Sequence, residues 1–283
     1  SWASAALAMG IFLQTHIAEV YEAATRTTRG FYGVLRVYES AVDTEDHNRA
    51  LYHGRINHGR QYLNEPWRYL PYAYYGDESG PGLLFHHHPS RKPENRKPMK
   101  FGVVGLGVGV LAAYAEPGDE VYLYEINSQV EDLARSEFSY LADCRGKESV
   151  ILGDARIVLE NELKTKGGQQ FDTLMVDAFS GDSIPIHLLT REAFELYFNH
   201  LKDDGVLAVH ITNLHIDLSD PVRTAAADLK KEILFIENDP EAYEENYSRW
   251  VLLSSSSEIF DEIKRAGYGT PWEKENPREI NWT

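Results

Sequence analysis

Three acidic residues each follow a short apolar run, a position in which carboxylates can bind and deprotonate ligands. Glu125 ends the run VYLYE, Asp154 follows VILG, and Asp177 follows FDTLMV. Open α/β sheets bind ligands at the edge where the carboxyl ends of their parallel strands meet. At that edge Glu125 can accept hydrogen bonds from both hydroxyls of a ribose, and Asp177 can accept a proton from an amine nucleophile. We therefore predict a ribose-containing ligand beside a carboxylate that acts as a base.

A glycine-rich loop lies between an apolar run over 101–104 and the run VYLYE. Gly105, Gly107 and Gly109 remove side chains where the chain turns sharply, and they let a ligand approach the backbone at the start of a small-residue helix over 110–115. Plain tight turns also use such glycines, so that interpretation stays open. Gly107, Gly109 and Ala112 also satisfy a dinucleotide-binding pattern. No set of residues for hydride transfer accompanies it, which makes a dehydrogenase the weaker hypothesis.

Apolar runs of strand length continue along the rest of the chain, with helical patterns between most of them. A capping box at Ser128 and Glu131 predicts one helix start, Thr190 a second, and Ser255 with Glu258 the last. The expected fold class is α/β, with one sheet of seven strands. These strands are predicted at 101–104, 121–124, 150–152, 171–176, 205–211, 233–236 and 250–253.

A small β unit is expected ahead of the glycine loop, starting with a strand over 31–39. Two His-Gly pairs, at His53 and His58, punctuate the hairpin that follows. Its histidines, and tyrosines such as Tyr75, either pack the hairpin or face a pocket. The basic, proline-punctuated stretch 86–98 is interpreted as a solvated linker. Its three consecutive histidines lack any accompanying zinc-binding pattern, so no metal site is predicted.

Composition indicates an ordinary globular protein. The chain has 283 residues, of which 43% are hydrophobic and 25% charged, and its formal net charge is −16. This charge disfavours non-specific binding to nucleic acid or anionic lipid, and it suits a cationic small substrate or simply keeps the protein soluble. The single cysteine, Cys144, allows no internal disulfide and favours a reducing compartment.

The first 13 residues are apolar but too short to span a bilayer, for which about 20 are needed. An ordinary helix continuing through Ala24 is the preferred interpretation, while a membrane segment further upstream stays open. The chain is thus divided into an N-terminal helix over 1–28, a small β-strand domain over 29–85 and a nucleoside-binding catalytic domain over 99–270.

Taken together and in this order, the motifs FYGVLRV, VGLGVG, YEIN, GDA and VDAFSGDSIP resemble those of the spermidine synthases, the polyamine aminopropyltransferases. DAFSGDSIPIHLLT is most similar to a bacterial subgroup in which this domain follows transmembrane helices. The resemblance implies a methyltransferase-like Rossmann fold of seven strands after a small β unit. It also implies a homodimer, either in the cytoplasm or at the cytoplasmic face of the inner membrane.

The resemblance further implies residue roles. The glycine loop would hold decarboxylated S-adenosylmethionine as a co-substrate, with Glu125 at its ribose and the GDA motif, Asp154 and Ala155, at its adenine. Asp177 would orient and deprotonate the attacking amine. Less securely matched residues near the nucleoside and the amine are Gln61, Tyr75, His58 and Asp182. Asp182 could hold the distal ammonium of a polyamine, or simply form a turn after Gly181.

Two positions depart from the family pattern. The aspartate that grips the donor's amine inside the family's glycine motif is replaced by Val108, and the family's Tyr-Gln pair is here Tyr32-Gly33. Three hypotheses follow: aminopropyl transfer to a polyamine-type amine, methyl or other alkyl transfer from S-adenosylmethionine, and a non-catalytic domain that senses nucleosides or polyamines for a membrane module.

Overall fold

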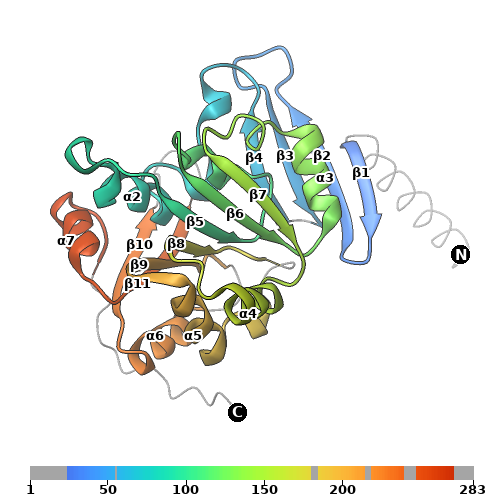
Figure 1. Ribbon diagram of the computed structural model, residues 1–283. Helices are drawn as coiled ribbons and strands as arrows, with labels where there is room; N and C mark the ends of the chain where they lie inside the picture. Colours follow the sequence, from blue (N-terminus) through green and yellow to red (C-terminus); the bar gives the residue numbers. More distant parts are fainter. Residues whose placement is uncertain (1–23, 55, 180–183, 214–217, 239–246, 271–283) are drawn as a thin grey trace, which may run out of the picture.

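Two β-sheets form the body of the computed structural model (Figure 1). It describes residues 24–54, 56–179, 184–213, 218–238 and 247–270. The expected N-terminal helix and Asp182 therefore lie outside the described residues, apart from the end of the expected helix at Ala24. Within the described ranges, no helix is long and apolar enough to cross a membrane.

The larger sheet has seven strands in the order β10-β11-β9-β8-β5-β6-β7, which confirms the expected number. β5 to β9 run parallel to one another, while β11 lies antiparallel to both β9 and β10. The strands are β5 (Lys100–Val104), β6 (Glu120–Glu125), β7 (Lys147–Leu152), β8 (Phe171–Val176), β9 (Leu201–His210), β10 (Glu232–Asn238) and β11 (Ser248–Ser254).

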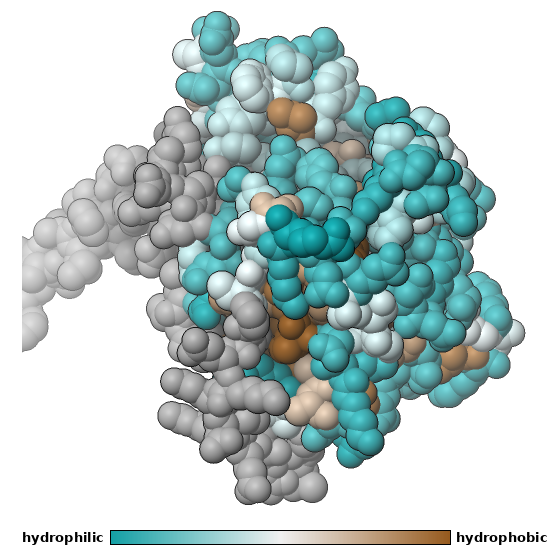
Figure 2. Space-filling model, turned by 90° about the vertical axis from the view of Figure 1, so that its left-hand side faces the viewer, coloured by the Kyte–Doolittle hydropathy of each residue, from teal (hydrophilic) through white to brown (hydrophobic). Residues whose placement is uncertain are grey.

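Helices cover both faces of this sheet because successive strand residues point to opposite sides. On β5, Phe101 and Val103 pack into one core and Val104 into the other. The first core includes residues of α2 (Gly80–His87), α3 (Ser128–Glu137) and α7 (Glu258–Arg265). The second includes residues of α4 (Ala155–Lys166), α5 (Arg191–His200) and α6 (Ser219–Asp228). The side of the molecule that carries α2 and α7 is mainly hydrophilic (Figure 2).

The smaller sheet is antiparallel, in the order β1-β2-β3-β4. Its strands are β1 (Ala24–Gly30), β2 (Gly33–Ser40), β3 (Asn48–His53) and β4 (Ile56–Tyr62). The expectation that a helix continues through Ala24 is wrong. Residues 24–30 are rich in β-branched threonine, and they pair along their length with β2, so that Thr27 lies opposite Arg36.

The local helix signals need three corrections. The segment after the glycine loop is a short 3-10 helix, η5 (Val110–Tyr114), that begins after the left-handed Gly109. Asn127, rather than Ser128, caps α3, because its side chain accepts the amide of Gln129. α7 begins at Glu258 with Ser257 as its N-cap, and the Ser256 hydroxyl accepts the amide of Glu258, so the expected cap at Ser255 is also wrong.

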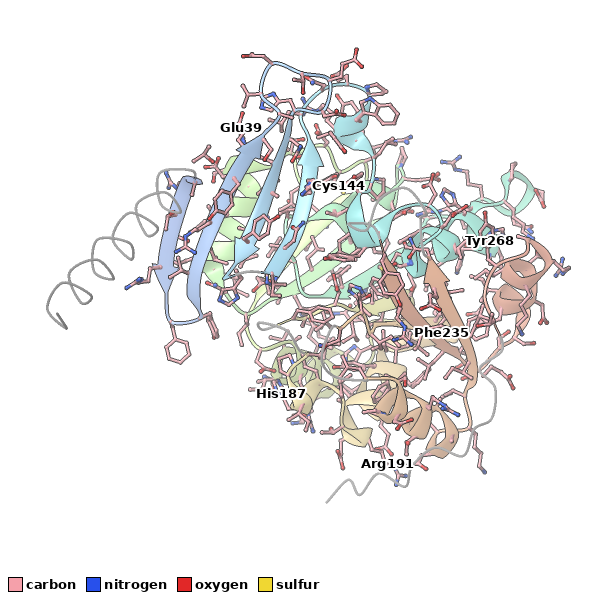
Figure 3. The ribbon with its side chains drawn as sticks, turned by 180° about the vertical axis from the view of Figure 1, so that it is seen from behind. Glu39, Cys144, His187, Arg191, Phe235 and Tyr268 are labelled. Atoms are coloured by element: carbon pink, nitrogen blue, oxygen red, sulfur yellow. The ribbon has the colours of Figure 1, made fainter. Side chains whose placement is uncertain are left out.

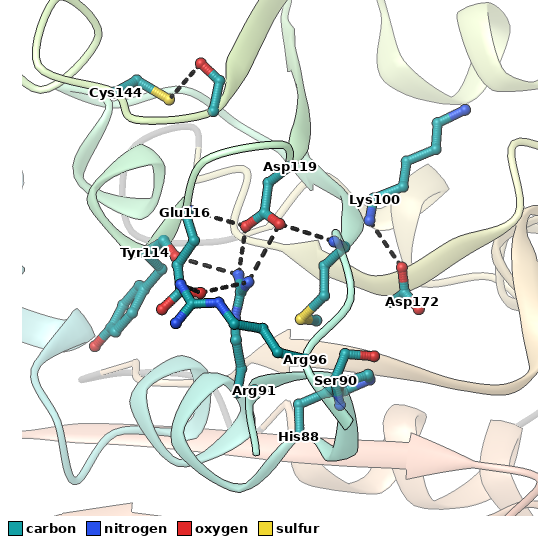
Figure 4. A network of polar contacts seen from close by, with 12 residues as sticks. His88, Ser90, Arg91, Arg96, Lys100, Tyr114, Glu116, Asp119, Cys144 and Asp172 are labelled. Atoms are coloured by element: carbon teal, nitrogen blue, oxygen red, sulfur yellow. Dashed lines mark hydrogen bonds and ion pairs between the residues drawn. The ribbon is translucent and has the colours of Figure 1, made fainter. Parts of the chain in front are cut away.

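The stretch 86–98 is not a solvated linker along its whole length. Arg91 is almost buried and donates to Asp119 at 2.5 Å and to the backbone oxygen of Tyr114 at 3.3 Å (Figure 4). Asp119 also accepts the amide of Met99 at 2.8 Å, and Glu116 pairs with both Arg91 and Arg96. Basic residues that the composition assigned to solvent thus fix the segment that leads into β5.

Candidate functional site

A cleft opens at the carboxyl ends of the parallel strands, where the smaller sheet faces them. It encloses about 800 Å³ of empty space, part of it open to solvent. Seven of the residues predicted from the sequence line it: His58, Gly105, Gly107, Glu125, Asp154, Ala155 and Asp177.

Strand register brings the three acids together. Val104 pairs with both Tyr124 and Val176, so Glu125 and Asp177 follow on either side of the end of β5. Backbone bonds continue the ladder, since the amide of Asp177 donates to Val104 at 2.8 Å. On the far side, the amide of Gly153 donates to Glu125 at 2.8 Å, which fixes the start of the loop that carries Asp154. The expected juxtaposition of acids follows directly from this parallel pairing.

Glu125 is buried and held by backbone donors. Its Oε2 accepts the amide of Leu106 at 3.1 Å, and its Oε1 accepts the amide of Asn127 at 2.8 Å. Burial raises the pKa of Glu125, and these amides oppose that rise. Each carboxylate oxygen keeps a second lone pair for a ligand hydroxyl. The geometry therefore suits a preorganised acceptor of two hydroxyl groups.

Asp154 caps α4 and also faces the cleft. Its Oδ1 accepts the amide of Ile157 at 3.2 Å, and its Oδ2 lies 3.1 Å from Nε2 of His187. His187 is half exposed in the short 3-10 helix Ile186–Leu188 before α5 (Figure 3). The guanidinium of Arg156 donates to its backbone oxygen. Our sequence analysis gave His187 no role, and it adds an imidazole to the Asp154 end of the cleft.

Asp177 is the most tightly held of the three acids. The Tyr75 hydroxyl donates to its Oδ2 at 2.6 Å, and Nδ1 of His210 lies 2.6 Å from its Oδ1. Burial, followed by the nearby Asp177 carboxylate, raises the pKa of Tyr75 well above 10, so the phenol keeps its proton and donates. Tyr75 thus lies behind Asp177 rather than in the lining of the cleft, and it acts on a ligand through that carboxylate.

His210, the last residue of β9, was missed by the sequence analysis. Its ring stacks on Trp250, with centroids 4.4 Å apart and planes at 4°. Its Nε2 lies 2.7 Å from the Thr212 hydroxyl, which in turn accepts the amide of Arg249. With a proton on Nδ1, the ring donates to Asp177, and its Nε2 accepts from the Thr212 hydroxyl, which satisfies this whole chain. The signal was available, because β9 is a buried strand that ends at the same edge as Asp177.

The glycine loop is shaped by close backbone approach. A Cβ on Gly105 would lie 2.4 Å from the backbone oxygen of Asp177, and one on Gly107 would lie 2.5 Å from that of His58. Both have positive φ, at 104° and 53°. The Cα of Gly109 faces the core instead, since a Cβ there would lie 3.0 Å from the Leu141 side chain. Gly105 and Gly107 line the cleft, whereas Gly109 packs against the core.

Gln61 is also placed away from the cleft. Its amide nitrogen donates to the Arg68 carbonyl at 2.9 Å and to the Ser139 hydroxyl at 2.8 Å, and its oxygen accepts the Ser139 amide at 2.9 Å. The side chain is fully buried. These bonds join β4 to the segment after α3, so the structure gives Gln61 a bracing role where the sequence indicated contact with a nucleoside.

His58 and His53 line the cleft from the smaller sheet, opposite the strand ends. Their ring centroids lie 5.7 Å apart. Burial, reinforced by His53, lowers the pKa of His58 from 6.5 to about 4, against an opposing effect of Asp177. His58 is therefore neutral at physiological pH. Of the two possibilities left open for the hairpin histidines, the structure favours facing a pocket.

Parts of this chain are similar in sequence to two known proteins. No family model matches the chain. It is 35% identical over 133 residues to the polyamine aminopropyltransferase of Vibrio vulnificus, which covers 46% of this chain and 40% of that protein. It is 30% identical over 109 residues to an N-terminal histidine N-methyltransferase of Emericella nidulans, covering 38% and 19%. The aligned regions thus span less than half of either curated relative.

Among solved structures, the spermidine synthase of Thermotoga maritima superimposes with a TM-score of 0.60 at 13% identity. The match covers 92% of this chain and 81% of that one. At 13% identity, this likeness shows the fold alone. It confirms the expected seven-stranded, methyltransferase-like α/β domain preceded by a small β unit. The motif resemblance stated above is supported by the sequence match.

Proposed function

We propose that this protein transfers an aminopropyl group from decarboxylated S-adenosylmethionine to a polyamine-type amine and releases methylthioadenosine. The observation that carries the proposal is the convergence of Glu125, Asp154 and Asp177 on one cleft, at the edge where the glycine loop leaves β5. The likeness to an aminopropyltransferase supports it.

The reaction asks little of the protein beyond positioning and proton removal. The amine nitrogen attacks the carbon attached to the sulfonium, the C–S bond breaks, and its electron pair stays on sulfur as a neutral thioether. The nitrogen gives up a proton. Glu125 holds the ribose and Asp154 with Ala155 borders the adenine, so that the sulfonium points toward Asp177. Holding both reactants in line supplies much of the rate.

Asp177 is the proposed proton acceptor. Tyr75 and His210 fix both of its oxygens, and each oxygen keeps a free lone pair for the amine. Its side chain is only 10% exposed, so water competes weakly for those positions. Tyr75 and His210 are positioning residues that aim the carboxylate.

The direct test is to incubate the protein with decarboxylated S-adenosylmethionine and a panel of di- and triamines, and to analyse the products by mass spectrometry. We expect an amine that has gained one aminopropyl group, together with an equal amount of methylthioadenosine. If the thioether appears with no alkylated amine, or if neither forms although the nucleoside binds, aminopropyl transfer is excluded.

Methyl transfer from S-adenosylmethionine is the second candidate, favoured by one departure at the site. Val108, which stands where the family has its amine-binding aspartate, is fully buried, and the second curated relative is a histidine N-methyltransferase. Parallel incubations with the carboxylated donor separate the two. A methylated acceptor and S-adenosylhomocysteine would replace the products named above.

Three further expectations remain proposals. We infer that the protein acts as a homodimer, in the cytoplasm or at the cytoplasmic face of the inner membrane. Light scattering on the purified chain tests the first. Fractionation of cells that express the protein tests the second, and recovery in the soluble fraction alone would exclude the membrane face. Asp182 stays a proposed ligand of a distal ammonium, to be tested by comparing the KM values of diamine and monoamine acceptors in Asp182→Asn.

A further inference from the structure

His58 carries a polar atom that the described structure leaves unsatisfied. Its Nε2 is shut off from solvent and has no hydrogen-bond partner among the described residues, although the residue lines the cleft. A buried polar atom without a partner costs about 1–3 kcal/mol, and such atoms in native proteins usually mark a functional site or an ordered water. By contrast, His187, which also lines the cleft, has Asp154 as a partner, and His210 behind Asp177 uses both of its ring nitrogens.

The position of His58 is fixed by two glycines. The close approach of its backbone oxygen to Gly107 clamps β4 onto the glycine loop. The next residue, Gly59, has a φ of 135°, and a Cβ there would lie 2.5 Å from Val108. Val108 therefore fills the space beside Gly59, in the core, and offers nothing polar to a ligand. Asn57 and His58 precede Gly59 on β4, and of these two residues His58 lines the cleft.

We propose that Nε2 of His58 accepts a hydrogen bond from the ammonium group on the tail of the sulfonium donor. On β4, this imidazole takes the task that a carboxylate within the glycine loop would otherwise perform. The inference rests on the proposed function and names the residue that selects the donor's tail.

The chemistry of the site favours an ammonium. An ammonium group has only donors, and a neutral imidazole offers one lone pair to receive it. The ring stays neutral because burial lowers its pKa to about 4, so no like charge opposes the ligand. Asp177 is close enough to His58 to influence that pKa, and its negative charge also attracts a cation. A buried neutral ring avoids the large desolvation cost of a buried carboxylate.

Calorimetry with three nucleosides tests the proposal. Methylthioadenosine lacks the tail amine, 5′-(3-aminopropyl)thioadenosine carries the ammonium alone, and S-adenosylhomocysteine carries the ammonium and a carboxylate. In His58→Leu we expect both ammonium-bearing ligands to lose affinity about tenfold or more, as for a hydrogen bond to a charged group. Methylthioadenosine should change less than twofold. His58→Gln, whose carbonyl can accept the same bond, should recover part of the loss.

His187→Leu is the matched control, because it alters an imidazole at the Asp154 end and should shift all three affinities alike. If His58→Leu also shifts all three alike or shifts none, His58 is structural and the inference is wrong. Loss of S-adenosylhomocysteine alone would mean that His58 donates to a carboxylate, which also overturns it. If the wild-type protein binds no nucleoside, the proposed function itself fails, and that result is separate from the others.

Discussion

Two histidines of the site have opposite surroundings: His58 lines the cleft, whereas His210 lies behind Asp177. His210, at the end of β9, uses both ring nitrogens, stacks on Trp250 and is 4% exposed. His58, on β4, has a buried nitrogen without a partner among the described residues. A satisfied buried ring fixes its neighbours, whereas an unsatisfied one is available to a ligand. We therefore call Asp177 and the His210 that holds it the positioning side of the site. We call the cleft wall that carries His58 the recognition side.

The largest effect is expected where the positioning side meets the substrate. Asp177→Asn keeps the shape but cannot take a proton. Turnover with a confirmed acceptor at saturating donor should fall by about two orders of magnitude or more, while methylthioadenosine affinity stays nearly unchanged. Asp228→Asn, on the exposed end of α6, is the control. Turnover within a few-fold of wild type would show that Asp177 only holds structure.

The recognition side can be tested through stability and pH. His58 has a folded pKa near 4 against 6.5 when exposed, so between these values the unfolded chain binds more protons than the native one. This contribution to stability is complete above pH 6.5 and is lost as the pH falls toward 4, by about 3 kcal/mol at most. His58→Gln should remove that part of the acid sensitivity, measured by urea unfolding at pH 5 and 8.

The difference between wild type and His58→Gln at pH 8 measures any structural effect of the substitution alone, since the ring is neutral there in both the native and the unfolded chain. Identical pH dependence in the two proteins would mean that His58 is not buried in the native state, and the contrast with His210 would disappear.

Substitution of His210 should lower both the free energy of unfolding and kcat. His210→Phe can keep the stack on Trp250, but it leaves Asp177 Oδ1 without the imidazole donor and the Thr212 hydroxyl proton without the imidazole acceptor. We expect a loss of about 1–3 kcal/mol in the free energy of unfolding and a lower kcat with little change in KM. His210→Asn, whose amide can donate to Asp177, should recover part of kcat. Unchanged kcat in the Phe variant would contradict a positioning role.

The smallest effect is expected for the exposed histidine. His187→Ala removes one contact to Asp154 on a side chain that is 45% exposed. Exposed pairs contribute about 0–1 kcal/mol, so the unfolding midpoint should barely move. Nucleoside affinity, measured by calorimetry, should fall about two- to fivefold. A much larger loss would place His187 directly on the ligand and add a third kind of histidine to the comparison.

Much of the positioning side was visible in the sequence. A buried apolar run such as FDTLMV is typical of a parallel strand, and the residue after such a strand lies at the carboxyl edge of the sheet. Asp177, Glu125 and Asp154 were placed at that edge by this rule. His210 was missed because it lies inside the strand predicted over 205–211 and ends β9 one residue earlier. Sequence signals predicted the ends of helices less accurately. Asn127, rather than the predicted Ser128, caps α3.

The recognition side was predicted only in part. His58 was named as a site residue and lines the cleft. For Gln61, the family resemblance implied a ligand contact, yet Ser139 and the Arg68 carbonyl occupy its amide. Ser139 lies 78 residues away in the chain, and nothing local announces that it will be adjacent.

By itself, then, the sequence determined where the seven strands lie along the chain, the glycine loop and the acids at three strand ends, because apolar runs and chain breaks are local properties. Only the tertiary structure decided what surrounds each acid. Tyr75 reaches Asp177 from 102 residues away, and Val108 fills the space beside Gly59 rather than facing a ligand. Such pairings depend on how the two sheets pack, since one face of β4 becomes a core or a cleft wall only when the glycine loop lies against it.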